Sequence, residues 1–337
     1  MTAAPRVLLF LAALLLGSQA NSQEARLLDD FSDASRWRAQ ASDGVTASGR
    51  PFEGGLRLDY DFSRGSGYAF LRRELPLELP ENFELRFRIR GQGRPNALEL
   101  KLVDASGENV WWHRRAEYVA PGEWTIIRVR RRQIEFAWGP TQDRTLRRAA
   151  AIEFVVAAGS GGGEGWFAVD DLTITALEVP PATPPPMVAM ASEGEGAAGA
   201  LDGDRSTAWT APAGAALTLD LGYRREFGGL VLRWKEGAHA SLYEVALSND
   251  GRNWSSVRTV HGGNDATDWL RMEESEARYV RLRPLRGAEA WDVHTSAGES
   301  IALAEVEIRP LAFGASANDA TRTPSRISRL TRSAASG

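Results

Sequence analysis

The chain has no cysteine among its 337 residues. This absence excludes a disulfide-stapled fold, a zinc–thiolate site, a cysteine nucleophile and lipidation at cysteine. Core packing must therefore stabilise whatever part of the chain folds. Any metal site must use oxygen ligands, which suit a hard cation such as calcium.

Lysine is nearly absent as well, since it occurs only at Lys101 and Lys235, and almost every basic residue is an arginine. Acidic residues outnumber basic ones, 44 to 40, and the formal net charge is -4. A protein that binds nucleic acid through its phosphates usually presents a clear excess of positive charge. The charge balance therefore argues against nucleic acid as a partner.

Recognisable catalytic motifs are also missing. The sequence contains no G-x-S-x-G, no H-E-x-x-H and no P-loop, and its four histidines are scattered. The glycine-rich stretch at 159–165 falls between two strand patterns, whereas a phosphate-binding loop leads from a strand into a helix. A glycosidase needs two carboxylates about 5 to 10 Å apart, and sequence alone leaves that arrangement open. We predict that the chain is not an enzyme.

Long apolar runs are absent except near the start, where VLLFLAALLLG follows Arg6 and leads to Ser18 and Ala20. This pattern predicts a secretory signal peptide over residues 1–20, and hence a secreted or periplasmic protein. The run is shorter than the roughly 20 apolar residues that span a bilayer, although a single uncleaved anchor is the alternative. After cleavage no membrane contact is expected.

Long amphipathic helical patterns are lacking, and strand-type alternation dominates instead. Large apolar residues alternate with charged or small ones over 83–90, 98–102, 217–221 and 243–247. This is the pattern of strands that bury one face. Repeated short strands separated by Gly, Asn and Asp turns predict an all-β protein built of sandwiches.

Five prolines within residues 179–187 interrupt these patterns. Proline removes backbone donors and favours an extended linker. We therefore predict a domain at 27–177, a Pro-rich linker at 178–189 and a second domain at 190–311. The Arg-, Ser- and Ala-rich residues 312–337 predict a disordered tail. A truncated or shifted reading frame is the alternative explanation of that tail.

The second domain carries five motifs in a specific order: LDGDRSTAW, LTLDLG, YEVALSNDGRNWSSV, ARYVRLR and LAEVEI. In this order and spacing they resemble the discoidin, or coagulation factor 5/8 type C, domain. The Asn249–Gly251 turn predicts a hairpin between residues 243–248 and 254–260. We expect Trp209 and Trp254 in the core, because large aromatic rings supply apolar area to a small sandwich.

The resemblance also implies a calcium ion that ties the DGDRST loop to the last strand. Such an ion would be structural and would carry no chemistry. Alternatively, Asp202 and Asp204 form Asx turns that need no metal. The implied ligands are the side chains of Asp202, Asp204, Thr207 and Glu305, with carbonyl groups near Leu201 and Ala304.

Members of this family bind glycans, phospholipid headgroups or proteins through loops at one end of the sandwich, so the resemblance does not name the ligand. The corresponding loops here are 235–241, 261–269 and 286–300. Aromatic rings that stack on sugars, beside polar groups that bond hydroxyls, point to a glycan. Our candidate residues are His239, Trp269, Trp291 and His294, and each has the alternative of packing on its own core.

The first domain begins with LLDDFSD and ends with GWFAVDDLTI. This pair of terminal motifs resembles those of jelly-roll carbohydrate-binding modules and galactose-binding-like domains, in which the first and last strands are neighbours. Asp29 or Asp30 would then lie near Asp170 or Asp171 and share a cation, and we take Asp30 and Asp170 as the candidate pair. The alternative is that these acids only cap and solvate the strand ends.

Aromatic residues of the first domain gather in two segments, 109–115 and 134–140, and the candidates for sugar binding are Trp111, Trp112 and Trp138. Adjacent strand residues face opposite sides, so at most one of Trp111 and Trp112 lies in the core. The run RVRRR at 128–132 would suit phosphate or sulfate groups, or else be a solvated strand face.

These observations predict an exported, non-catalytic carbohydrate-binding protein with two β-sandwich modules and a glycan or polysaccharide as partner. The tandem modules would gain avidity on a polymer through their short linker. Two alternatives stay open: an accessory N-terminal region of a larger carbohydrate-active enzyme, or an adhesion module that binds a cell-surface protein.

Overall fold

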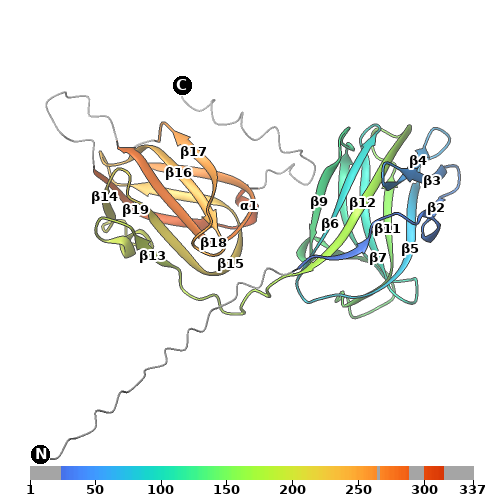
Figure 1. Cartoon of the computed structure of the whole chain (residues 1–337), viewed down its shortest axis with the longest axis horizontal. Helices are drawn as coiled ribbons and strands as arrows, with labels where there is room; N and C mark the ends of the chain where they lie inside the picture. The colour runs from blue at the N-terminus through green and yellow to red at the C-terminus, as the bar shows by residue number, and fades with distance from the viewer. Residues whose placement is uncertain (1–23, 264–265, 288–299, 315–337) are drawn as a thin grey trace, which may run out of the picture.

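The computed structural model describes residues 24–263, 266–287 and 300–314 and is almost entirely β-structure, as the alternation predicts (Figure 1). The predicted signal peptide and nearly all of the predicted tail lie outside these residues. Within them, no helix has the length and apolar character needed to cross a bilayer.

The first sandwich consists of two six-stranded antiparallel sheets. In sheet A the first and last strands of the domain pair, as expected for a jelly roll. The order of sheet A is β3 (Thr46–Phe52), β4 (Gly55–Asp61), β12 (Glu164–Ala176), β6 (Phe83–Gln92) and β9 (Thr125–Arg130), and β1 (Arg26–Asp29) pairs with β12.

Sheet B forms the other layer of this sandwich. Two single-turn 3-10 helices, η1 (Ala34–Arg36) and η2 (Arg131–Gln133), lie in its connections. The order of sheet B is β10 (Glu135–Trp138), β8 (Val110–Tyr118), β7 (Asn96–Val103), β11 (Arg148–Ala157), β5 (Tyr68–Glu78) and β2 (Arg38–Ala41).

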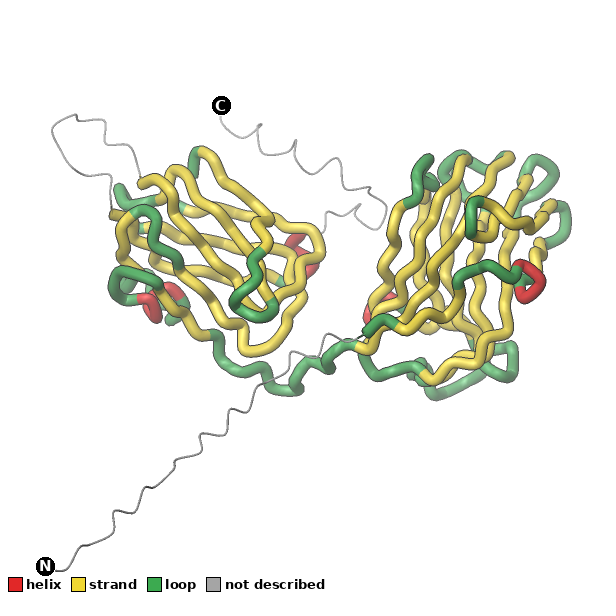
Figure 2. Tube along the Cα trace, viewed as in Figure 1, coloured by secondary structure: helices red, strands yellow, loops and turns green. Residues whose placement is uncertain are grey.

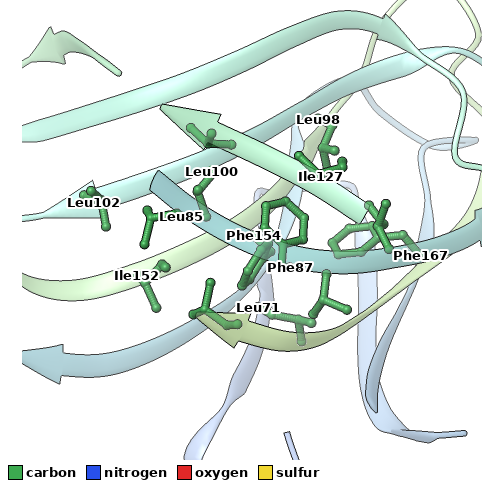
Figure 3. Close-up of a cluster of buried hydrophobic side chains, with 14 of the residues drawn as sticks. Leu71, Leu85, Phe87, Leu98, Leu100, Leu102, Ile127, Ile152, Phe154 and Phe167 are labelled. Carbon is green, nitrogen blue, oxygen red and sulfur yellow. The ribbon is translucent and has the colours of Figure 1, made fainter. Parts of the chain in front are cut away.

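The two sheets enclose the first core (Figure 3). The alternating residues of β6, from Phe83 to Ile89, point into it and are no more than 2% exposed. Phe87 meets Phe154 of β11 edge to face, with ring centroids 4.9 Å apart. Such contacts supply the packing that a chain without disulfides requires.

The second sandwich is a seven-stranded antiparallel arrangement, sheet C, with its own core. Its longest strands, β15 (Leu217–Trp234) and β18 (Thr267–Gly287), pair with two register shifts, and such bulges let a strand bend. The order is β14 (Trp209–Pro212), β19 (Ser300–Arg309), β15, β18, β16 (Ala240–Ser248) and β17 (Ser255–His261), with β13 (Val188–Ala191) on β15 and the 3-10 helix η3 (Ala197–Ala200) between β13 and β14.

The predicted hairpin is confirmed, since β16 and β17 pair around Asn249–Gly251 and Gly251 has a φ of 70°. Trp209 is fully buried, as expected. Trp254 is not in the core: it is half-buried at the hairpin end, with the Arg281 guanidinium 4.2 Å above its ring. Its place just before β17 keeps it at the surface.

The predicted start of the tail is wrong by a few residues. Leu311–Gly314 forms a helical turn, α1, which packs on β15 and β18. Phe313 lies with its ring centroid 6.1 Å from that of Trp269. A Cβ on Gly229 would come within 2.8 Å of the Phe313 ring, so this contact requires glycine there. The packing of Phe313 on Trp269 orders this turn, although the polar composition of the segment predicts disorder.

The linker after β12 has no regular secondary structure, and Figure 2 shows it running between the two sandwiches. Ion pairs also join the sandwiches directly. Arg130 pairs with Glu84 of its own domain and Glu276 of the other, and Arg132 pairs with Glu226 at 2.8 Å. The hypothesis that RVRRR receives phosphate or sulfate is therefore wrong for these two arginines, because carboxylates across the domain junction already occupy them.

Candidate functional site

Strand β7 carries charged groups on the face of sheet B that points away from the core. Leu98, Leu100 and Leu102 point inward, so Glu99 and Lys101 must point outward. Both are nevertheless buried, Glu99 at 4% and Lys101 at 7% exposure. Neighbouring side chains on the same outer surface cover them. We call this surface the Lys101 face, formed by Tyr68, Glu99, Lys101, Trp112, Arg114, Glu135, Trp138 and Glu153.

Ion pairs make the burial of these charges tolerable. Lys101 Nζ lies 3.1 Å from Glu99 Oε2, and Arg114 Nε donates to Glu99 Oε1 at 3.1 Å. A charge removed from water must be paired and hydrogen bonded, or the fold loses several kcal/mol. One carboxylate thus serves two cations, and this cluster carries one net positive charge.

Three aromatic rings surround the Lys101 ammonium. Its nitrogen lies 5.0 Å from the ring centroid of Trp138, 5.5 Å from Tyr68 and 6.0 Å from Trp112. Trp112 and Trp138 meet edge to face at 5.5 Å and 89°. Cation–π attraction and this ring contact hold the side chains in place. Trp138 is still 46% exposed and Tyr68 45%, so each ring keeps a surface open to a ligand.

Trp111 and Trp112 separate as strand geometry requires. Trp111 is 5% exposed and packs in the core, where its Nε1 donates to the Arg144 carbonyl at 2.7 Å. The prediction that at most one of the pair is buried is confirmed. Trp111 as a sugar-binding candidate is wrong, because no face of its ring is accessible. Trp112 lies on the Lys101 face, where its Nε1 donates to Glu135 at 3.2 Å.

Tyr68, Glu99 and Lys101 are site residues that sequence reasoning missed. One feature of the sequence could have indicated Lys101. It is the single lysine of the first domain, and it stands between two leucines of an alternating strand. That position predicts an outward side chain. Nothing local indicates that Tyr68 comes beside it, because the contact depends on the order β5, β11, β7 in sheet B.

His113 points toward the core side of β8, opposite Leu100. Its Nδ1 lies 3.2 Å from the Gln133 carbonyl, and its Nε2 accepts from Arg115 Nε at 3.3 Å. Arg115 can only donate, so the neutral ring carries its proton on Nδ1. Burial, with the positive charge of Arg115, lowers the pKa of His113 from 6.5 to about 4.

The carboxylates at the start and end of the first domain have partners within the protein. Asp29 accepts hydrogen bonds from the Phe31 amide at 2.7 Å and Trp37 Nε1 at 2.9 Å, and it pairs with Arg73. Burial of this acid is therefore fully compensated.

Asp170 pairs with Arg88, while Asp30 is exposed and bonds Ser32, which lowers the pKa of Asp30. Arginine thus neutralises Asp170, and the structure does not support a cation shared by Asp30 and Asp170. Over the described residues, no three acidic or histidine side chains gather as a metal site.

Hydrogen bonds link the predicted calcium-binding residues of the second sandwich, although among the described residues their carboxylates do not gather as a group of three. Glu305 of β19 is 8% exposed and accepts the Gly203 amide at 2.9 Å. Thr207 donates its hydroxyl to Asp202 Oδ2 and the Asp204 carbonyl, both at 2.8 Å. Burial raises the pKa of Glu305, and the negative charge of nearby Asp202 adds to that effect.

The oxygen atoms of this loop are of the chemical type that a hard cation prefers. Among the described residues Glu305 forms no ion pair with lysine, arginine or histidine and accepts the Gly203 amide, while the Thr207 hydroxyl donates to the Asp202 carboxylate and the Asp204 carbonyl of the same loop. The ammonium of Lys235 binds the Arg205 and Ser206 carbonyls at 2.5 and 2.8 Å, which supplies part of the positive charge. Asp204 also bonds the Ser206 amide, as the Asx-turn alternative predicts.

Of the residues in the predicted ligand loops of the second sandwich, some lie on strands and others in loops. Trp269 is on β18, opposite Val231, and is 58% exposed with Phe313 beside it. Its neighbour Asp268 points inward and accepts from Trp234 Nε1 and the Tyr243 hydroxyl, each at 2.9 Å. His239 is half-buried in its loop. Trp291 and His294 lie outside the described residues.

The geometry defines an all-β protein of two antiparallel β-sandwiches. Residues 183–300 match the model of the F5/8 type C domain family, so the second sandwich is a domain of that family, as its motifs predict. No curated protein sequence matches the chain.

Carbohydrate-binding modules are among the solved structures to which the chain is similar. The family 11 module of the cellulosomal cellulase Lic26A-Cel5E of Clostridium thermocellum is 19% identical over 46% of this chain and 97% of its own, with a TM-score of 0.38. Chitosan-binding module 2 of a chitosanase/glucanase from Paenibacillus sp. IK-5, solved with chitotriose, is 25% identical over 37% and 96%, with a TM-score of 0.32.

The pKa of His113 predicts acid sensitivity of the first sandwich. The unfolded chain binds a proton at this residue near pH 6.5 and the folded chain near pH 4, so between these values the unfolded state holds more protons. Stability should therefore fall as pH falls through this window, by at most about 3 kcal/mol.

His113→Gln keeps a donor and an acceptor but cannot be protonated. Urea unfolding from pH 7 to pH 4 should show a smaller loss for this variant than for wild type. His261→Gln, at an exposed position, is the matched control and should behave like wild type. Equal pH dependence in all three proteins would contradict the assignment.

Proposed function

We propose that the protein binds carbohydrate through the Lys101 face of its first sandwich. One observation carries this proposal: the exposed rings of Trp138 and Tyr68 flank a buried, ion-paired floor of Glu99 and Lys101. Rings held by their neighbours before a ligand arrives lose little entropy on binding, which favours affinity.

The chemistry of this face suits a sugar. The apolar C–H faces of a pyranose stack on indole or phenol rings, while its hydroxyls need hydrogen-bond partners at the ring edges. Glu135 and Arg114 lie beside Trp112 and supply an acceptor and donors. Extended strands place these groups along the sheet, as a polymer chain requires.

The carboxylates of this face are arranged for binding. Glu99 is held by Lys101 and Arg114, and Glu153 pairs with Arg72 at 2.7 Å. A general acid or base must reach the substrate to exchange a proton with it, and Glu99 and Glu153 are instead engaged by arginine or lysine side chains of the protein. This supports a non-catalytic role for the first sandwich.

The proposal extends to an exported protein whose F5/8 type C domain acts as a second module on the same polymer. Trp269, exposed on β18, is its described candidate for glycan contact. Two alternatives compete: this chain is the accessory region of a larger carbohydrate-active enzyme, or it binds a cell-surface protein. A polysaccharide ligand would favour the first two of these roles over binding to a cell-surface protein.

Alanine at Trp112 and Trp138 tests the Lys101 face. The double variant should bind its best polysaccharide at least tenfold more weakly in affinity gel electrophoresis, since ring stacking contributes about 0.5–1.5 kcal/mol per contact beyond buried area. Its thermal unfolding should stay close to wild type. Trp111→Ala is the comparison, because loss of that core ring should lower stability by about 3–5 kcal/mol.

The proposal would be rejected if none of a panel of plant, fungal and bacterial polysaccharides slowed the migration of the wild-type protein. It would also be rejected by a Trp112/Trp138 double variant that binds as tightly as wild type. If the double variant unfolds, the single Tyr68→Ala variant provides the test. Unchanged polysaccharide binding by that variant would also count against the proposal.

We also propose that calcium binds the loop of Asp202, Asp204 and Thr207 together with Glu305, and stabilises the second sandwich. Calcium would offset the charge of the buried Glu305 and tie its strand to the loop. Added calcium should raise the melting temperature and a chelator should lower it. Glu305→Gln should abolish the calcium response, and Glu244→Gln on β16 is the control that should keep it. A wild-type melting curve that ignores calcium would leave the Asx turns as the sufficient explanation.

A further inference from the structure

A pocket of 640 Å³ lies at the junction of the two sandwiches, away from the Lys101 face. Both domains contribute to it: Asn82 comes from the first sandwich, Pro180 from the linker, and Tyr223, Arg225 and Arg309 from the second. Binding sites for small ligands commonly occupy domain interfaces and measure about 300–1,000 Å³. The pocket has the place and the size of such a site.

Arginine dominates the polar lining of this pocket, and most of the acidic residues in it are already occupied. Glu276 accepts from both Arg130 and Arg224, the latter at 2.9 Å. Glu226 pairs with Arg132 at 2.8 Å. These acids therefore have little capacity to neutralise further cations.

Two other arginines of the lining keep unused donors. Arg225 Nη2 donates to the Pro185 carbonyl at 3.0 Å, and Arg309 Nη1 pairs with Glu307 at 3.0 Å. The Nε of each is buried and has no hydrogen-bond partner in the structure. Because these two Nε atoms have no accessible surface, the donors left for a ligand are Arg225 Nη1 and Arg309 Nη2, which form no hydrogen bond among the described residues.

An oxyanion is the acceptor that this geometry suits. Guanidinium groups bind carboxylate and sulfate oxygens through paired N–H donors, and these charge-assisted bonds are among the strongest hydrogen bonds in proteins. The Arg225 guanidinium lies 4.8 Å from the Tyr223 ring centroid, which limits its movement. The donor is thus held in place before a ligand arrives.

We propose that this pocket binds an acidic saccharide, in which a carboxylate or sulfate group on a sugar ring is held by Arg225 and Arg309. An inorganic anion alone would fill little of 640 Å³. The remaining lining suits a sugar, since Met187 and Leu311 offer apolar surface and Asn82 offers an amide. The site is separate from the Lys101 face and does not depend on glycan binding there.

Binding at this junction has a mechanical consequence. The ligand contacts the second sandwich through its arginines and the first through Asn82 and Leu177. It would add to the Arg130–Glu276 and Arg132–Glu226 pairs, and so fix one arrangement of the two modules.

Isothermal titration of the full chain tests the proposal with four probes: tetragalacturonate, a sulfated tetrasaccharide, neutral cellotetraose and sodium sulfate. At least one acidic tetrasaccharide should bind, more weakly as salt concentration rises, and sodium sulfate should bind at least tenfold more weakly. The two acidic probes distinguish a carboxylate from a sulfate ligand. Equal binding of sodium sulfate, or no binding of either acidic probe, would overturn the proposal.

Variants at the two arginines locate the site. Arg225→Gln and Arg309→Gln, made separately, should each weaken the acidic tetrasaccharide at least tenfold. Arg252→Gln, at an exposed arginine in the β16–β17 loop, is the matched control and should bind like wild type. The Trp112→Ala/Trp138→Ala variant should also bind it like wild type, which separates this site from the Lys101 face. If both arginine variants fold, by circular dichroism, and bind unchanged, the assignment is wrong.

Discussion

The ion pair between Glu99 and Lys101 is the interaction on which the candidate site depends. Both side chains point out of sheet B, yet both are buried, so each compensates the other for the loss of contact with water. The pair fixes an ammonium group among three aromatic rings and thereby orients Trp112, Trp138 and Tyr68. Lys101 is the only lysine of the first domain, and it lies where it contacts all three of these rings.

Arginine performs the corresponding task elsewhere in the molecule. Arg73 and Arg88 neutralise buried aspartates at the ends of the first sandwich, and Arg130 and Arg132 connect the two domains. A planar guanidinium that binds carboxylates through several donors suits these roles better than lysine. The arginine-rich composition, which as a sequence feature names no partner, is thus used largely for internal pairing. At the junction pocket, Arg225 and Arg309 each make one such contact and keep an Nε without a hydrogen-bond partner.

Strand alternation predicted the all-β fold and much of both cores, because inward residues such as Phe83 and Leu100 repeat with period two. It also predicted that Trp111 and Trp112 separate, but not which of them is buried, since that depends on which face of sheet B meets sheet A. The side-chain contacts across the domain junction escaped prediction. Arg130 and Glu276 are 146 residues apart in sequence, and no local pattern marks one as the partner of the other.

Local composition was misleading where packing overrides it. Phe313 lies in a segment whose composition predicts disorder, yet its ring packs beside Trp269. Asp268, a polar residue at the end of a predicted loop, points inward and bonds Trp234 and Tyr243. In both places a contact with a residue of the sheet outweighs the local composition.

The most direct test of the account is to observe the tryptophan indole N–H signals of 15N-labelled protein by NMR while the tightest-binding oligosaccharide is added. The account predicts that the signals of Trp112 and Trp138 shift with a common saturation curve, whereas the buried indole of Trp111 stays in place. Shifts confined to other tryptophans, with Trp112 and Trp138 unchanged at saturation, would contradict it.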